Sequence, residues 1–397
     1  MARSVPEGFR VAGVHAGIKS SPEKLDLSLI VGVEPCVAAG VYTRNRVVAA
    51  PVAVDRDRTP GDHVRVLVAN SGNANACTGE RGFQNALEMG ELAARSCDAA
   101  AEQSLVLSTG IIGEYLPMEK IGAGIDRAAR QLGDDETALL NAARGILTTD
   151  THEKMAARSV QLDTRRVEIV GFAKGSGMIG PQMATMLAVL MTDAPLHPHT
   201  AQHVLQRAVD ASFNCISVEG HTSTNDSVIL LASGKAGGHE LSGPDLTRFA
   251  ETLQTLCVDL ARMIPADGEG ASHLMTIDVA GCATPQDAQR IAKTVANSAL
   301  VKTAVAGADP NWGRIVSAAG YASVPFDPNQ LQLYVNGILL FARGIPASFD
   351  ASAVSDSIAR NRDTHIELVF DRGHATTRFW TSDLTVDYVR INADYHT

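Results

Sequence analysis

One glycine-rich segment carries residues whose types and spacing are suited to chemistry. It reads KGSGMIGPQMATML over residues 174–187. Its three glycines follow the G-x-G-x-x-G spacing that binds a dinucleotide pyrophosphate, which also needs a helix to begin there and an acidic residue about 20 positions on. Here Pro181 follows at once, and the next acid is Asp193. An NAD-dependent oxidoreductase is therefore a remote reading, and a tight glycine turn between strands is favoured.

A histidine cluster is the second segment with chemical potential. His197, His199 and His203 have a spacing that could suit zinc. Pro195 and Pro198, however, predict a loop that leads into a helix at about residue 200. We therefore favour a polar helix start and expect no metal site.

Strands and helices are both predicted around these segments. Short apolar or alternating runs predict strands at 64–69, 167–172, 331–335, 366–370, 378–380 and 386–391. Helical spacing is found at 82–101, 121–143, 201–213, 242–263 and 285–300. The mixture predicts an α/β or α+β fold with helices layered on sheets, and one strand leads directly into the glycine-rich segment.

Composition narrows the class of protein. The 397 residues are 45% hydrophobic, which is typical of a globular chain, and the formal charge of −10 argues against nucleic-acid binding. No apolar run approaches the length of a membrane span, and the first 20 residues show no secretory signal. The six cysteines are scattered without CxxC pairs. We expect a cytoplasmic enzyme that binds small molecules.

The glycine-rich segment resembles the signature of the ornithine acetyltransferase family of arginine biosynthesis. In that family the precursor cleaves itself at an Ala-Thr bond, which here joins Ala184 and Thr185. The resemblance implies an α chain of residues 1–184 and a β chain of residues 185–397. It makes Thr185 the new N-terminus and the nucleophile.

The chemistry of this residue type agrees with that role. A threonine hydroxyl is a poor nucleophile and needs an adjacent base. A free α-amine has a pKa of about 7.7–8.0, so it can act as that base near neutrality. Only cleavage before Thr185 creates this amine, and a strained glycine turn would favour attack of the hydroxyl on the preceding carbonyl.

Six further blocks resemble the family along nearly the whole chain. They are VANSGNANACTG at 68–79, STGIIG at 108–113, TTDT at 148–151, DGEGA at 267–271, VKTAVAGADPNWGR at 301–314 and YVRINADYHT at 388–397. By resemblance, Thr109 and Gly110 form the oxyanion hole, in line with the donors that acyl transfer requires. The implied substrate-binding residues are Thr148, Lys174, Thr185, Glu269, Asn392 and Thr397.

One block departs from the family. Where the family usually has Asp-Gly-Asp, this chain has Glu219, Gly220 and His221. One acidic charge is lost at His221, so any role of that loop is open.

The resemblance implies a complete reaction. The acetyl group passes from N2-acetyl-L-ornithine to Thr185 and then to L-glutamate, with no metal and no nucleotide cofactor. Some family members also take the acetyl group from acetyl-CoA, and no residue here separates the two kinds. The implied fold is a layered α/β/β/α sandwich similar to that of N-terminal-nucleophile enzymes, with α and β chains packed as α2β2 or larger. The alternative is a related self-processing aminopeptidase or amidohydrolase, which would hydrolyse rather than transfer.

Overall fold

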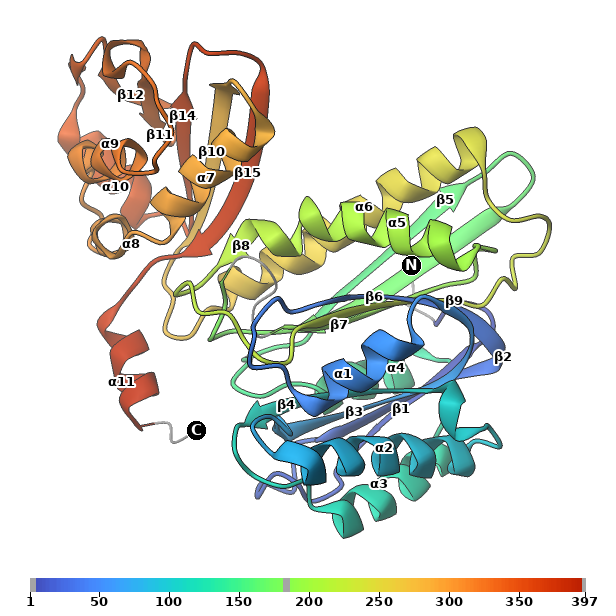
Figure 1. The fold of residues 1–397 in the computed structure, drawn as a ribbon. Helices are drawn as coiled ribbons and strands as arrows, with labels where there is room; N and C mark the ends of the chain where they lie inside the picture. Colours follow the sequence, from blue (N-terminus) through green and yellow to red (C-terminus); the bar gives the residue numbers. More distant parts are fainter. Residues whose placement is uncertain (1–4, 181–185, 395–397) are drawn as a thin grey trace. The chain divides into compact units, whose positions relative to one another are not determined.

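The computed structural model describes residues 5–180 and 186–394, which form two compact units (Figure 1). The first unit comprises the residues up to 214 together with 222–263. Among the described residues, the second comprises 215–221 and 264–394. Among the described residues, no helix has the length and apolar character that crossing a membrane requires.

The first unit is built on one sheet with the strand order β4-β3-β2-β9-β7-β6-β5, and β1 pairs with β2. Its strands are β1 (Phe9–Val14), β2 (Leu27–Tyr42), β3 (Gly61–Asn73), β4 (Ser104–Ile111), β5 (Lys154–Gln161), β6 (Arg166–Lys174), β7 (Leu187–Thr192) and β9 (Ser227–Ala232). The long strand β2 has irregular register between Val31 and Ala38. Its first part pairs with β3 and its last part with β9, so it joins two halves of the sheet.

Alternation along the strands divides the side chains between two cores. Leu67 of β3 packs in one cluster with Phe172 of β6 and Val189 of β7, so this core lies between the two halves of the sheet. Val66 and Val68 face the other way, into a second core under α2 and α3. The helices are α1 (Ala50–Arg58), α2 (Gly79–Ser96), α3 (Met118–Arg130), α4 (Glu136–Gly145), α5 (Pro198–Asp210) and α6 (Gly243–Ala266).

The outer face of β6 and β7 is covered by α6. A Cβ at Gly171 of β6 would lie 3.1 Å from Leu260 and 3.3 Å from Leu256, so the glycine lets this helix approach closely. Helices therefore cover the outer face of each half of the sheet (Figure 1), while α4 contributes Leu139 and Ala142 to the core between the halves. The layered α/β/β/α fold is confirmed within this unit.

The second unit carries its own sheet, in the order β13-β12-β11-β14-β10-β15-β8. The strands are β8 (Ile216–Ser217), β10 (Leu274–Cys282), β11 (Gln332–Val335), β12 (Ile338–Ala342), β13 (Ile345–Pro346), β14 (Asp363–Val369) and β15 (Ala375–Ser382). The helices are α7 (Pro285–Ala296), α8 (Ala299–Ala306), α9 (Trp312–Gly320), α10 (Ala351–Ala359) and α11 (Val386–Asp394). Short 3₁₀ turns lie at Ala101–Gln103, Phe213–Cys215 and Pro328–Gln330.

Three predicted elements are corrected. Residues 121–143 form two helices, because Asp135 accepts a hydrogen bond from the amide of Ala138 and starts α4. The helix expected at 285–300 ends at Ala296, because Ser298 caps α8. Residues 386–391 form α11 instead of a strand, because the Thr385 hydroxyl accepts from the amide of Tyr388 three residues on.

Candidate active site

Strand ends of the first unit meet at one place. Strands β3 and β4 are parallel and end there, while β7 and β9 are parallel and begin there. The side-chain amide of Asn225, just before β9, donates to the carbonyl of Ala74 at 2.6 Å and to that of Ser108 at 2.9 Å. The end of β4, with the predicted oxyanion residues, is thereby tied to the loop before β9.

The predicted oxyanion pair lies at the end of β4. Thr109 is buried, and Gly110 has a φ of +133°. A Cβ at Gly110 would lie 2.3 Å from the carbonyl carbon of Gly72 and 2.5 Å from the amide nitrogen of Asn73. The close approach of β3 therefore requires glycine at this position. The oxyanion role itself stays a prediction.

The predicted cleavage residues Ala184 and Thr185, and the terminal Thr397, lie outside the described residues. Met186 is described and buried, and its amide donates a 3.1 Å hydrogen bond to Oδ1 of Asp226. Met186, which follows Thr185, is therefore held by the residue that directly precedes β9.

The glycine-rich segment joins antiparallel strands. Lys174 ends β6 and pairs with Leu187, the first residue of β7. The next element among the described residues is thus a strand of the same sheet, whereas the dinucleotide motif needs a helix. The favoured reading, a glycine turn between strands, fits this arrangement.

A buried carboxylate organises the predicted substrate-binding residues Lys174 and Thr148. Asp150 lies 2.7 Å from the ammonium of Lys154 and 3.9 Å from that of Lys174. It also accepts from the amides of Gly175 at 2.6 Å and Thr148 at 3.1 Å. Burial opposes ionisation, but the two lysines outweigh it and hold the pKa of Asp150 well below its usual range. One carboxylate therefore faces two ammonium groups, which suits a substrate carboxylate nearby.

Lys19 is a further cation here that the sequence did not reveal. Its ammonium donates to the carbonyls of Leu25 at 2.7 Å and of Leu147 at 2.6 Å, beside Thr148. Burial lowers its pKa to about 8; the charge of Lys174 also lowers it, while Asp26 raises it. A single lysine in a loop carries no sequence signal, so only the fold identifies it.

The remaining predicted substrate residues lie in the second unit. The side-chain amide of Asn392 in α11 donates to Glu269 Oε2 at 2.9 Å. A Cβ at Gly270 would lie 2.5 Å from the amide nitrogen of Tyr388, so this glycine allows α11 to contact the 267–271 loop. Burial and the charges of Glu219 and Glu269 raise the pKa of Tyr388 to about 12. Two carboxylates near one helix suit a substrate amine.

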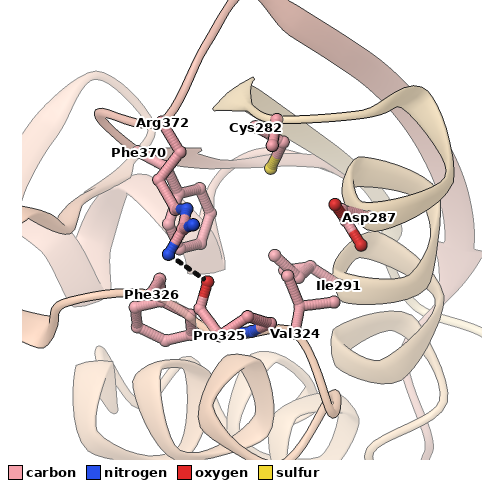
Figure 2. Close-up of a pocket in the computed structure, with 9 residues that line it drawn as sticks. Cys282, Asp287, Ile291, Val324, Pro325, Phe326, Phe370 and Arg372 are labelled. Carbon is pink, nitrogen blue, oxygen red and sulfur yellow. Dashed lines mark hydrogen bonds between the residues drawn. The ribbon is translucent and has the colours of Figure 1, made fainter.

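Two other features do not belong to this site. The ring of His197 accepts from the amide of His199 at 3.3 Å and caps α5, which is the polar helix start we favoured. Figure 2 shows a pocket in the second unit whose lining includes Cys282, Phe370 and Arg372. None of the predicted site residues lines it.

Comparison with known proteins identifies the family. Residues 10–397 match the ArgJ family. The arginine biosynthesis bifunctional protein ArgJ of Rhodopirellula baltica is 47% identical over 396 residues, covering 99% of this chain and 96% of that protein. The protein of the same name from Geobacter sulfurreducens is 43% identical, covering 98% and 99%. A crystal structure of ArgJ from Bacillus halodurans matches with a TM-score of 0.50 and 38% identity over 51% of this chain and 96% of that one. This chain belongs to the ArgJ family.

Proposed function

We propose that this chain cleaves itself between Ala184 and Thr185 and then transfers the acetyl group of N2-acetyl-L-ornithine to L-glutamate in arginine biosynthesis. The observation that carries this proposal is the meeting of strand ends around Asn225 and Asp226. There the loop before β9 contacts both Ser108, which precedes the predicted oxyanion residues, and Met186, which follows Thr185. Membership of the ArgJ family, whose relatives are named for arginine biosynthesis, supports the same reaction.

Each group has a defined part in the transfer. The α-amine of Thr185 takes the proton of its own hydroxyl, and the oxygen attacks the acetyl carbonyl. Thr109 and Gly110 stabilise the oxyanion. Ornithine leaves with the proton, and an acetyl ester remains. The amine of glutamate attacks this ester, its proton returns to the threonine oxygen, and N-acetylglutamate departs.

The substrate-binding residues implied by the family resemblance fall into two chemical groups. Thr148 and Lys174, with its partner Asp150, suit the carboxylate. Glu269, Asn392 and Thr397 suit the amine. No metal and no nucleotide cofactor takes part in this scheme. The word bifunctional in the relatives' names supports acetyl-CoA as a second acetyl donor.

One comparison supports a cut near the middle of the chain. The matched Bacillus halodurans chain is covered to 96% yet spans only 51% of this sequence. A chain of that length fits one product of such a cut. We further propose that the two products stay together as α2β2 or a larger assembly.

The first experiment is the intact mass of the denatured protein. Cleavage predicts fragments of about 19 and about 22 kDa, the larger beginning with Thr185. Acetyl transfer is then assayed with and without glutamate. If acetate is released at the same rate with and without glutamate, and no N-acetylglutamate forms, the result favours a hydrolase instead. Full transfer by an uncleaved Thr185→Ala protein would refute the role of this residue.

A further inference from the structure

Lys19 is a cation that takes no part in the reaction as proposed above, yet it contacts two predicted blocks of the site. Its ammonium donates to the carbonyl of Leu147, the residue before Thr148, at 2.6 Å. Its aliphatic stem lies against β3, because a Cβ at Gly72 would be 3.2 Å from Cγ of Lys19. Gly72 pairs in turn with Gly110 of β4. Lys19 therefore lies between the predicted oxyanion strand and the predicted substrate-binding block.

A buried carboxylate holds the loop that carries Lys19. Asp26 is fully buried and accepts from four successive backbone amides, those of residues 16–19. The ammonium of Lys19 itself donates to two carbonyls, of Leu25 at 2.7 Å and of Leu147. An ammonium has three N–H donors, and the third has no partner among the residues that the structure describes. Asp26 thus fixes the loop, while one donor of Lys19 is left for a ligand.

Burial leaves this ammonium short of negative charge. It lowers the pKa of Lys19 to about 8, because the charges of Asp26 and Asp150 only partly oppose it and Lys174 adds repulsion. A carboxylate bound beside Lys19 would supply negative charge and accept the third hydrogen bond. Lys19 is only partly buried, whereas Lys174 is buried, so a ligand can reach it.

The two substrates of the proposed transfer differ in charge at the end of the side chain. N2-acetyl-L-ornithine carries an ammonium there, and L-glutamate carries a carboxylate. Glu269, which suits the amine, would repel that carboxylate. Both substrates share an α-carboxylate, which Thr148 and Lys174 suit. The second carboxylate of glutamate therefore calls for another cation near these two residues.

We propose that Lys19 binds the side-chain carboxylate of L-glutamate and so makes the enzyme prefer a dicarboxylate acceptor, an inference that rests on the proposed function. The contact is a charge-assisted hydrogen bond from the third N–H of the ammonium. Lys19 makes and breaks no covalent bond in this role. It determines which acceptor is bound in the second half of the transfer.

The test compares L-glutamate with L-glutamine as acetyl acceptors. Glutamine has nearly the same shape but carries a neutral amide in place of the side-chain carboxylate. The measured quantity is the ratio of kcat/KM for the two acceptors, because a general loss of activity affects both and cancels. We expect wild type to prefer glutamate and Lys19→Gln to lose at least tenfold of that preference. Lys19→Arg, which keeps a cation, should retain more of it.

Lys120→Gln is the matched control. The ammonium of Lys120 also donates to a carbonyl of the same loop, that of Gly17 at 2.8 Å, but Lys120 is exposed. This variant should keep the wild-type preference, and an equal loss in both variants would contradict the proposal.

Two results separate this inference from the proposed function. An unchanged preference in Lys19→Gln, or a wild type that accepts glutamine as well as glutamate, overturns the role of Lys19 and leaves acetyl transfer in place. A wild type that acetylates neither acceptor overturns the proposed function, and this inference with it. If Lys19→Gln does not fold, as judged by its melting temperature, Lys19→Met is read in its place by the same criteria.

Discussion

The side chain of Asn225 donates a 2.9 Å hydrogen bond to the carbonyl of Ser108, although the two residues are 117 positions apart. Ser108 directly precedes the predicted oxyanion pair. Asn225 directly precedes Asp226, which holds the amide of Met186. One side chain thus links the two groups that the proposed acyl transfer must align. The predicted oxyanion pair and Met186, which follows the predicted nucleophile, are thus tied to one loop, and Asn225 itself has no proposed chemical role.

This link can be cut by replacing Asn225 with alanine. The change leaves the carbonyls of Ala74 and Ser108 without this donor inside the protein, at a cost of about 1–3 kcal/mol. We expect kcat for acetyl transfer to fall at least tenfold with KM nearly unchanged, because alignment is lost rather than binding. Urea unfolding and steady-state kinetics measure the two effects.

The control for this change is Asn336→Ala in the second unit. Asn336 also makes two side-chain hydrogen bonds, to Ser357 and to the amide of His365. It should lose comparable stability and keep its kcat. An equal fall of kcat in both variants would contradict the alignment role of Asn225.

Gly110 is predicted to tolerate no side chain. An alanine Cβ would lie 2.3 Å from the carbonyl carbon of Gly72, so β3 would have to move. Since removing an oxyanion donor costs about 10²–10³ in rate, we expect Gly110→Ala to lose at least 100-fold in acetyl transfer. Gly113→Ala is the matched control, because its φ of +88° is also positive but nothing lies within 4 Å of its Cβ. Similar losses in both would mean that backbone strain alone explains the effect.

Sequence reasoning found the residues that stand in distinctive local blocks. The glycine-rich turn after a strand and the STGIIG run could be recognised because each is contiguous; the first follows β6 and the second begins within β4. Asp226 and Asn225 were passed over. Their roles depend on β9 lying parallel to β7, a pairing of distant segments that no local pattern reports.

The C-terminal helix is an element for which the sequence pattern predicted the wrong structure. Residues 386–391 alternate in polarity, which favours a strand, yet they form α11. The hydroxyl of Thr385 caps this helix and also donates to the carbonyl of Gly270 at 2.6 Å. The second contact depends on a loop more than 100 residues earlier, so the sequence pattern alone favoured the wrong element.

Asp150 is predicted to stabilise the protein and to position Lys174. Asp150→Asn removes the carboxylate charge that pairs with both Lys154 and Lys174. Breaking a buried ion pair in this way costs about 3–5 kcal/mol of stability. We also expect KM for N-acetylornithine to rise about tenfold, because Lys174 loses its anchor. Asp356→Asn is the control, since Asp356 pairs with Arg360 on an exposed surface. Unchanged stability in Asp150→Asn would refute this account.

Lys302 is predicted to make stability depend on pH. It lies in the 301–314 block, is buried, and donates to the hydroxyl of Thr381 at 2.9 Å and to the carbonyl of Ser382. Burial lowers its pKa to about 7 from 10.5, although Asp383 and Glu219 raise it. Between these two pH values the unfolded chain binds more protons than the folded one, so the free energy of unfolding should rise with pH across this window.

Lys302→Met should remove that part of the rise. One proton contributes at most about 1.4 kcal/mol per pH unit, so the urea midpoint of wild type should rise relative to that of the variant between pH 7 and pH 9.5. Lys24→Met, at an exposed position, should leave the slope unchanged. The absolute stability of Lys302→Met is not diagnostic, because the hydroxyl of Thr381 also loses a partner. The slope is diagnostic, and an identical pH slope in wild type and Lys302→Met would show that Lys302 keeps its ordinary ionisation inside the fold.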